Sequence, residues 1–449
     1  NAIGAGRSVA DADHSPPFGE PGAQFVIFLE PVAQAIQPLS HEFIRGFEEY
    51  RKFLATVDWS EPLAYFDGVV VRNIHRPTQF YHLLLDRLRD DRTMDDGVTW
   101  SVQSDFLARL ADWDVDDDPA WPIQRREREA LLSLDVPYFD AGAEAGMRRV
   151  RAQASRLGDD ETAWQCELIR QTSSFRGADT GADADWFDHQ LSPYELQPEA
   201  DAVAERIATY AVRRGRAASW LGLNWLPESD TAQPAVLGND LYSGNCGIAV
   251  FLAAHSRVRN CSQSGELAYA ALTAVRADLH ARSACRVSRI MGIGGATGLG
   301  SIAYALSTAA TLLADDALHT DADRAADLIT DELIQSDNRF DIVGGAAGAI
   351  LGLLSVHRTH GYAHSLQQAV RCGEHLITKR PATDAGLPGM SHGAAGFAYA
   401  LGALADASGD LRFVDEAYRW LAVERQHRRT ESALHPQWCH GATGAGLAM

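Results

Sequence analysis

The chain has 449 residues, of which 46% are hydrophobic, 22% charged and 8% aromatic. This is an ordinary globular composition, and it excludes collagen-like, low-complexity and disordered chains. With 40 Lys and Arg against 60 Asp and Glu, the net charge of −20 argues against a nucleic-acid partner bound through a basic surface. Six dispersed cysteines make no disulfide framework and indicate a reducing compartment, so we expect a cytoplasmic protein.

The ends of the chain and its apolar runs carry no membrane or export signal. No run approaches the roughly 18 apolar residues of a membrane helix, so we expect no integral membrane segment. The N-terminal Asn-Ala-Ile-Gly lacks an initiator Met and a signal-peptide pattern, and the C-terminal Gly-Leu-Ala-Met stops inside an apolar pattern. We therefore expect an internal fragment of a longer protein.

The first part of the chain carries three distinctive segments. Residues 71–85 contain Arg72 and Thr78 in the sequence Arg-x-x-x-Arg-Pro-Thr. Leu134–Asp140 and Trp164–Arg170 follow later in the same part of the chain. Without the flanking motif, a surface ion pair would be the preferred interpretation of Arg72.

Two polar segments mark loops and a domain boundary. The acidic cluster Asp112–Asp118 is typical of a solvated loop, with docking of a basic leader peptide as the alternative. Ser174–Asp188 is polar, rich in Gly, Ala and Asp and without periodicity, so it predicts a linker. A helical stretch, Glu199–Gly215, follows it. We therefore expect one domain over residues 1–190 and a second over residues 191–449.

A small-residue tetrad, Gly-x-x-Gly, recurs five times in the second domain. The first glycines are 48 to 51 residues apart, and this near-constant spacing indicates a repeat architecture. Glycines allow positive φ and the close approach of helices, although tetrads that only pack the helices would look the same. The tetrads are Gly244–Gly247, Gly295–Gly298, Gly345–Gly348, Gly393–Gly396 and Gly441–Gly444.

Two kinds of predicted helix alternate between the tetrads. Ala- and Leu-rich runs follow the first four tetrads, as in Phe397–Leu401, and predict buried inner helices. More polar stretches with one apolar stripe, Ala322–Ile334 and His364–Leu376, predict half-exposed outer helices. One such pair per 50 residues or so is typical of an α/α toroid, a ring of helix hairpins. If each tetrad opens an inner helix, the residues beside the tetrads converge on one mouth.

The residues beside the tetrads could carry chemistry. Asp341 precedes the third tetrad, His392 the fourth, and Cys439 with His440 the fifth. A thiol, imidazoles and a carboxylate at one mouth suggest zinc binding and general acid–base chemistry. The structural alternatives are a packed thiol for Cys439, a turn residue for His392 and a helix cap for Asp341. The other cysteines are expected to be buried small hydrophobes rather than ligands: Cys166, Cys246, Cys261, Cys285 and Cys372.

The motifs Trp-Cys-His-Gly and, one period earlier, Ser-His-Gly-Ala-Ala-Gly resemble those of the lanthionine cyclase (LanC-like) family over about residues 200–449. The resemblance implies an α/α barrel around one zinc ion, with Cys439 as a zinc ligand, His392 as the active-site His and Asp341 as the active-site Asp. The family's other two ligands, an adjacent Cys-His pair, would fall beyond residue 449. In the resembling proteins the position of His440 is not a ligand.

The segments of the first domain look like the C-terminal part of the dehydratase domain of class II lanthipeptide synthetases, the LanM type. The resemblance implies phosphorylation of Ser and Thr with ATP and Mg²⁺, followed by phosphate elimination. It assigns Arg72 and Thr78 to the elimination step, where Arg72 would clamp a phosphate. Gly6–Val9 resembles the opening of the kinase-like lobe, but we find no counterpart of the residues that hold Mg-ATP.

Together these interpretations predict a mainly α protein, an α/α toroid preceded by a partial kinase-like α+β region. The implied function is lanthipeptide biosynthesis: dehydration of Ser and Thr, then zinc-dependent addition of a Cys thiolate to give thioether rings, with His392 returning a proton and Asp341 orienting it. The implied partners are a ribosomal precursor peptide with a leader and an exporter of the product. Two alternatives stay open, a different barrel enzyme such as a glycosidase and a non-catalytic toroid that only binds peptide.

Overall fold

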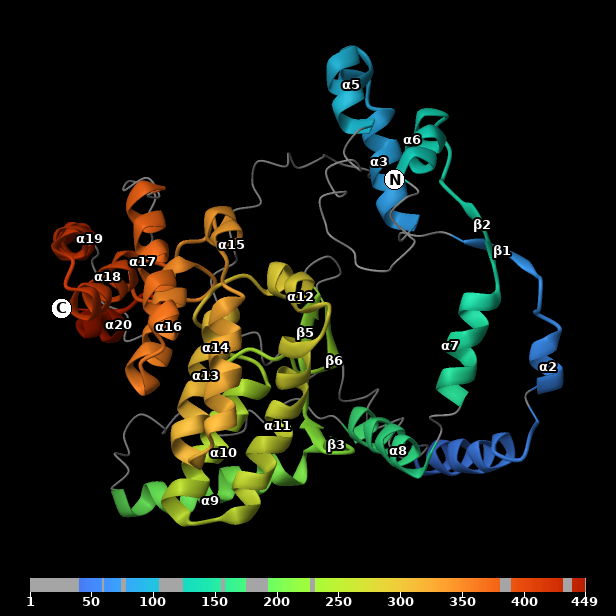
Figure 1. Cartoon of the computed structure of the whole chain (residues 1–449), viewed down its shortest axis with the longest axis horizontal. Helices are drawn as coiled ribbons and strands as arrows, with labels where there is room; N and C mark the ends of the chain where they lie inside the picture. Colours follow the sequence, from blue (N-terminus) through green and yellow to red (C-terminus); the bar gives the residue numbers. More distant parts are fainter. Residues whose placement is uncertain are drawn as a thin grey trace, which may run out of the picture. The chain divides into compact units, whose positions relative to one another are not determined.

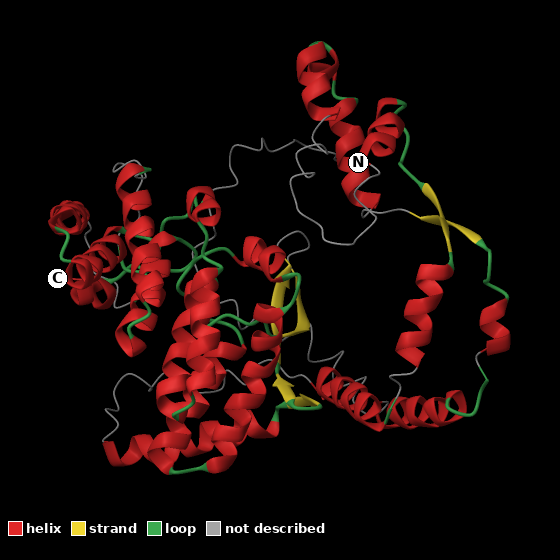
Figure 2. Cartoon of the chain, viewed as in Figure 1, coloured by secondary structure: helices red, strands yellow, loops and turns green. Residues whose placement is uncertain are grey.

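The computed structural model describes residues 40–58, 60–73, 78–104, 124–154, 158–174, 193–226, 231–379, 389–430 and 438–448. Helices dominate these residues, and the strands form three two-stranded antiparallel sheets (Figures 1 and 2). The mainly helical fold class is therefore confirmed. Three predicted features, the segment Gly6–Val9, the acidic cluster Asp112–Asp118 and all but the first residue of the linker Ser174–Asp188, lie outside the described residues.

The chain divides into two compact units. The larger comprises Asn1–Glu49, Thr162–His280 and Ser288–Met449, and the smaller Tyr50–Glu161 and Ala281–Val287. The expected division at residue 190 stays a prediction. Among the described residues, no helix combines the length and the apolar character needed to cross a bilayer.

The smaller unit has its own hydrophobic core. Tyr81, Leu84, Leu85 and Leu88 on α3 pack with Leu131 of α6, and all five are nearly inaccessible. Antiparallel pairing of β1 and β2 places Arg72 opposite Asp140. The elements are α2 (Ser60–Ala64), β1 (Val70–Asn73), α3 (Thr78–Leu88), α4 (Asp91–Met94), α5 (Gly97–Ser104), α6 (Gln124–Leu132), β2 (Phe139–Gly142) and α7 (Glu144–Ala154).

The other elements begin with a helix over residues 40–54 and α8 (Asp159–Ser174). Next come α9 (Pro193–Thr209) and the strand pairs β3 (Val212–Arg214) with β4 (Ala217–Ser219) and β5 (Leu221–Leu226) with β6 (Thr231–Val236). The remaining helices are α10 (Asn245–Arg259), α11 (Ser262–His280), α12 (Ala284–Met291), α13 (Leu299–Leu313), α14 (Asp316–Asp327), α15 (Asp331–Ser336), α16 (Ala346–His360), α17 (Ala363–Thr378), α18 (Ala394–Ser408), α19 (Leu411–Thr430) and α20 (Ala442–Ala448).

Inner and outer helices alternate as the sequence predicts. The inner helices α10, α13, α16 and α18 are rich in fully buried Ala and Leu, and α13 packs against both α10 and α16 (Figure 1). Each inner helix also packs against the outer helix that comes after it: α11, α14, α17 and α19. The hairpins therefore share one continuous core, whereas their closure into a ring stays a prediction.

Two predicted helices are shorter than expected. The stretch Glu199–Gly215 is helical only to Thr209, because its last residues form strand β3 and Gly215, at a φ of +58°, lies in the turn of the β3–β4 hairpin. The stretch Ala322–Ile334 is two helices, because Thr330 caps a new one, α15, with its side chain accepting from the Leu333 backbone N–H. The stretch His364–Leu376 lies within α17, as predicted.

In the second repeat, the inner helix begins after the last glycine of the proposed tetrad instead of after the first. Gly244, Gly345 and Gly393 are N-cap residues of inner helices, but in the second repeat the N-cap is Gly298, the last glycine of the proposed tetrad. The equivalent of the later glycine is therefore Ser301, a fully buried residue whose hydroxyl donates to the Gly298 carbonyl at 2.6 Å. A serine satisfied in this way fills a position that glycine occupies in the other repeats.

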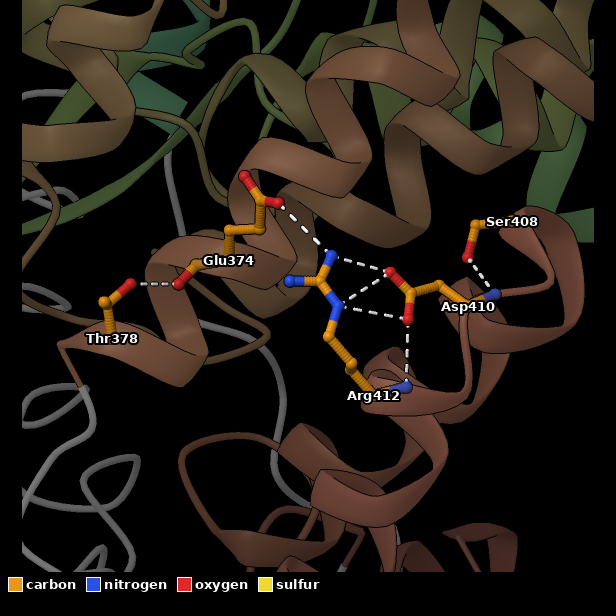
Figure 3. Close-up of polar contacts among 5 residues, drawn as sticks. All are labelled: Glu374, Thr378, Ser408, Asp410 and Arg412. Carbon is orange, nitrogen blue, oxygen red and sulfur yellow. Dashed lines mark hydrogen bonds and ion pairs between the residues drawn. The ribbon is translucent and has the colours of Figure 1, made fainter.

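A surface network ties two outer helices together. The Arg412 guanidinium at the start of α19 donates to the Asp410 carboxylate at 2.7 Å and to Glu374 on α17 at 3.4 Å (Figure 3). The hydrogen bonds from the Arg412 side chain and backbone lower the pKa of Asp410. Exposed ion pairs contribute little stability, so the network mainly orients the start of α19.

Candidate active site

A series of backbone hydrogen bonds joins the loops that precede the inner helices. Each bond runs from one loop to the next, so all five loops meet at one end of the helix hairpins. This agrees with the expected convergence of the residues beside the tetrads. The bonds run from Leu241 N to Ala296 O (3.2 Å), Gly295 N to Ile342 O (3.0 Å), Ile342 N to Ser391 O (3.1 Å) and Ser391 N to Cys439 O (3.2 Å).

Asp341 and His392 meet across two of these loops. One Asp341 carboxylate oxygen accepts a hydrogen bond from the Gly344 backbone N–H at 2.7 Å, and the other lies 2.6 Å from Nδ1 of His392. The Asp341 side chain is 12% exposed and that of His392 41%. Because an ionised carboxylate only accepts, Nδ1 of His392 is the donor and Nε2 is the nitrogen left to exchange a proton. Asp341 thus holds its own loop and the imidazole at once.

Cys439 and His440 lie beside this pair. The His440 ring stacks on His392, with ring centroids 5.8 Å apart. Cys439 is half-buried, and its carbonyl accepts the Ser391 N–H from the loop of His392. Gly389 lies against both residues at a φ of +100°, and a Cβ atom there would lie 2.5 Å from the His440 Cα. The close approach of the two loops therefore requires glycine at this position.

Glu424 supports the same loop and was not predicted from the sequence. It is a fully buried carboxylate on α19, and it accepts the Gly389 backbone N–H at 2.9 Å. The sequence does contain a sign of this role. Glu424 follows Phe413, Ala417 and Trp420 at helical spacing, so it lies on the same buried stripe of α19. An acidic residue on an apolar helix stripe needs a buried partner, and here the partner belongs to the candidate site.

Arg72 and Thr78 lie in the smaller unit. Arg72 is exposed on β1, and its guanidinium carbon lies 4.4 Å from the centre of the Tyr138 ring. Thr78 is exposed and is the first residue of α3. The described residues show no direct bond between Arg72 and Thr78, and residues 74–77 lie outside them. Among the described residues, the contact found for Arg72 is this cation–π contact and not the surface ion pair that was considered.

The other cysteines divide into buried and accessible thiols. Cys166, Cys246 and Cys372 are buried as expected, and burial raises the pKa of the Cys246 and Cys372 thiols far above its ordinary value. The expectation of burial is wrong for Cys285, which is exposed, and incomplete for Cys261, which is half-buried. Cys261 directly precedes the outer helix α11, and Cys285 lies at the start of the short helix α12.

The residues present do not by themselves fit a zinc ion. Within the described ranges, no three or more His, Cys, Asp and Glu side chains are grouped so that they could hold a metal. Cys439 offers one thiol, while Asp341 and His392 are engaged with one another. The role of Cys439 as a ligand therefore stays a prediction, as do the two ligands implied beyond residue 449.

Comparison with known families gives two matches. Residues 235–449 match the family described as lanthionine synthetase C-like protein. Residues 22–142 match a domain of unknown function, DUF4135, which is found in the N-terminal region of LanM-type synthetases. No curated protein matches the chain. The first match contains Asp341, His392 and Cys439, the second contains Arg72 and Thr78, and together they confirm the resemblance stated from the motifs.

Proposed function

We propose that this chain, which joins a DUF4135 domain to a lanthionine synthetase C-like cyclase domain, forms thioether rings in lanthipeptides. The observation that carries the proposal is the 2.6 Å contact between Asp341 and His392, in loops bonded to the loop of Cys439, within the region that matches the cyclase family. The substrate would be a ribosomal precursor peptide with a leader.

Ring formation needs one proton to be removed and one to be delivered. The sulfur of a peptide Cys forms a bond with the β-carbon of a dehydroalanine or dehydrobutyrine, and the π electron pair moves to give an enolate. The thiol loses one proton and the α-carbon gains one, so a single acid–base group balances the reaction. His392 has the required pattern, with Nδ1 held by Asp341 and Nε2 free to carry the proton.

The surroundings of His392 favour the charged species of ring formation, which are the imidazolium, the thiolate and the enolate. Asp341 stabilises the imidazolium that delivers the proton and fixes the tautomer that accepts it. His392 directly precedes Gly393, the N-cap of α18, and the positive end of that helix favours a thiolate or an enolate. The side chains of the chain itself therefore account for the proton transfer.

LanC-like cyclases typically bind zinc, which would supply deprotonation of the peptide thiol. Cys439 is the residue here that would contribute a thiolate ligand. The described residues alone form no complete ligand set for zinc.

The smaller unit would supply the dehydroamino acids. Elimination breaks the bond between the Ser or Thr β-carbon and the phosphate oxygen and removes the α-proton, which leaves a C=C bond and free phosphate. Arg72 is exposed and its guanidinium is held over Tyr138, so its donors can take the charge of the leaving phosphate. Thr78 would assist at the start of α3. Phosphorylation itself would need ATP and Mg²⁺.

Cyclisation of a synthetic peptide tests the proposal. The protein is expressed from its complete reading frame, supplied with Zn²⁺ and incubated with a peptide that carries one dehydroalanine and one Cys. Mass spectrometry after thiol alkylation then measures the loss of free Cys. We expect faster ring formation than without protein, and a loss of about a hundredfold or more in His392→Asn and Asp341→Asn.

His357→Asn is the matched control, because His357 lies at the opposite end of α16 from the loop of Asp341. It should cyclise the peptide at the rate of the unmodified protein. A protein that binds the peptide but leaves the rate of ring formation unchanged would show that this domain only binds peptide, and the proposal would be wrong.

A further inference from the structure

A cavity of about 560 Å³ lies beside the candidate site. One wall is the loop that ends at Gly344, the residue whose backbone N–H holds Asp341. The other walls are the end of α12, the segment Gly238–Asp240 and the end of α15. The volume is within the range of about 300–1,000 Å³ for pockets that bind small ligands, so the cavity can take a side chain and its neighbours from a peptide.

The cavity combines an apolar wall with a cation. Ile290, Met291 and Leu333 line it, and Ile290 is 71% exposed, so its aliphatic side chain is accessible to a ligand. Arg339 also lines it, and its side chain lies against Gly344 in the loop of Asp341. An aliphatic wall next to a guanidinium suits a ligand with both an apolar and an anionic part.

The Arg339 guanidinium has no carboxylate partner among the described residues. The nearest acidic residues of the cavity are engaged with the backbone: the Asp337 carboxylate accepts the N–H groups of Arg339, Phe340 and Ala346. The Asp240 carboxylate accepts the Ser243 N–H at 2.7 Å. Arg289, the second arginine of the lining, has a long contact of 3.5 Å with the exposed Glu332. Arg339 is therefore the cation most available to a ligand.

We propose that this cavity is a subsite of the cyclase domain that binds an acidic side chain, Asp or Glu, of the substrate peptide. The carboxylate would lie on Arg339, and the aliphatic side chain next to it on Ile290 and Leu333. Charge-assisted bonds between a guanidinium and a carboxylate are strong and directional. The proposal rests on the proposed function, because only a peptide undergoing ring formation needs to be held next to Asp341 and His392.

The net charge of the chain makes the proposal specific. At −20 the protein repels an acidic peptide in general, so a preference for acidic peptides has to come from a local cation. If the preference for acidic peptides is lost when Arg339 alone is replaced, the peptide binds in this cavity.

Binding of short probe peptides to the full chain tests the subsite. The probes are fluorescently labelled Gly-Leu-Glu-Leu-Gly and its analogues with Gln or Lys in place of Glu, and Kd is measured by fluorescence anisotropy. We expect the Glu peptide to bind about tenfold tighter than the Gln peptide, and Arg339→Gln to remove this difference. Arg339→Glu should instead prefer the Lys peptide over the Gln peptide.

Arg257→Gln is the control, because Arg257 is an exposed arginine in the last turn of α10, at the far end of that helix from its glycine loop. It should keep the full preference for Glu. Equal affinities for the Glu and Gln peptides in the unmodified protein, or a preference that survives in Arg339→Gln, would overturn the subsite. The probes contain no Cys, Ser or Thr, so their binding is independent of ring formation, and a failure of the cyclase assay leaves this result readable.

Discussion

Glu424 has no exposed surface, yet its carboxylate reaches the backbone of the loop that carries His392. Replacing it with Leu leaves the Gly389 N–H buried without its partner, which costs about 1–3 kcal/mol, and loosens the loop. We expect Glu424→Leu to lower kcat for ring formation about tenfold or more with little change in KM, because a misplaced acid–base group affects the transition state rather than binding. Glu424→Gln keeps an acceptor oxygen and should recover most of kcat.

The control for this residue is on the same helix. Glu416 is also buried, at 3% exposed, and its carboxylate accepts a hydrogen bond from Arg419 on the same helix. Glu416→Gln should therefore leave kcat unchanged. If Glu424→Leu loses thermal stability but keeps its kcat, Glu424 is a core residue with no part in positioning His392.

At the scale of single residues, the sequence predicts the contacts that depend on the repeat and misses those that depend on burial. Asp341 and His392 stand beside glycines one period apart, and the structure brings them into contact. Glu424 has no such position, because its significance comes from a partner 35 residues away. Cys285 shows the reverse error: burial is predicted for it, but its side chain is exposed on the short helix α12.

Helices α13 and α16 approach each other through glycine, and this makes a prediction about packing. A Cβ atom at Gly352 on α16 would collide with the backbone of Gly300 on α13. Backbone atoms cannot rotate away, so Gly352→Ala has to push the helices apart. Overpacking of this kind costs about 1–3 kcal/mol and outweighs the gain of about 1 kcal/mol from the better helix propensity of Ala. We expect a lower free energy of unfolding by denaturant.

Gly402 provides the opposite case on α18. Nothing lies within 4 Å of a Cβ atom there, so Gly402→Ala gains propensity without a clash and should raise the free energy of unfolding by up to about 1 kcal/mol. If both substitutions changed the free energy of unfolding in the same direction, close contact between the two helices would not explain why position 352 is glycine.

At the scale of elements, the period of the helices is predictable and their ends are not. The alternation of inner and outer helices results from the apolar patterns, which extend over many residues. The break before α15 depends on the side chain of Thr330, and the β3–β4 turn depends on Gly215, so each is decided by one residue. The second repeat also differs at a single residue. Ser301 occupies the position at which the other repeats have glycine.

At the scale of the whole molecule, composition and repeat predict a mainly helical protein, and the structure confirms it. The family matches add what composition cannot show, since they place a DUF4135 domain before a cyclase domain. The closure of the helix hairpins into a ring and the kinase-like character of the first region stay predictions. They depend on contacts between distant parts of the chain, which no local pattern encodes.

Two units with separate cores predict two separable activities. Arg72 lies in the smaller unit and His392 in the larger. A peptide carrying one phosphoserine bypasses the ATP-dependent step, so mass spectrometry can follow the loss of phosphate directly. We expect Arg72→Ala to slow elimination about a hundredfold, since a bidentate guanidinium stabilises the leaving group. The same variant should cyclise a peptide that already carries dehydroalanine at the normal rate.

The reciprocal variant and a neutral arginine complete the test. His392→Asn should eliminate phosphate normally and fail to cyclise. Arg149→Ala, an exposed arginine on α7 of the same unit as Arg72, should affect neither reaction. If Arg72→Ala retained elimination, Tyr138 would hold the guanidinium for stability alone. If it lost both reactions, the two units would have to act as one, contrary to the separate cores.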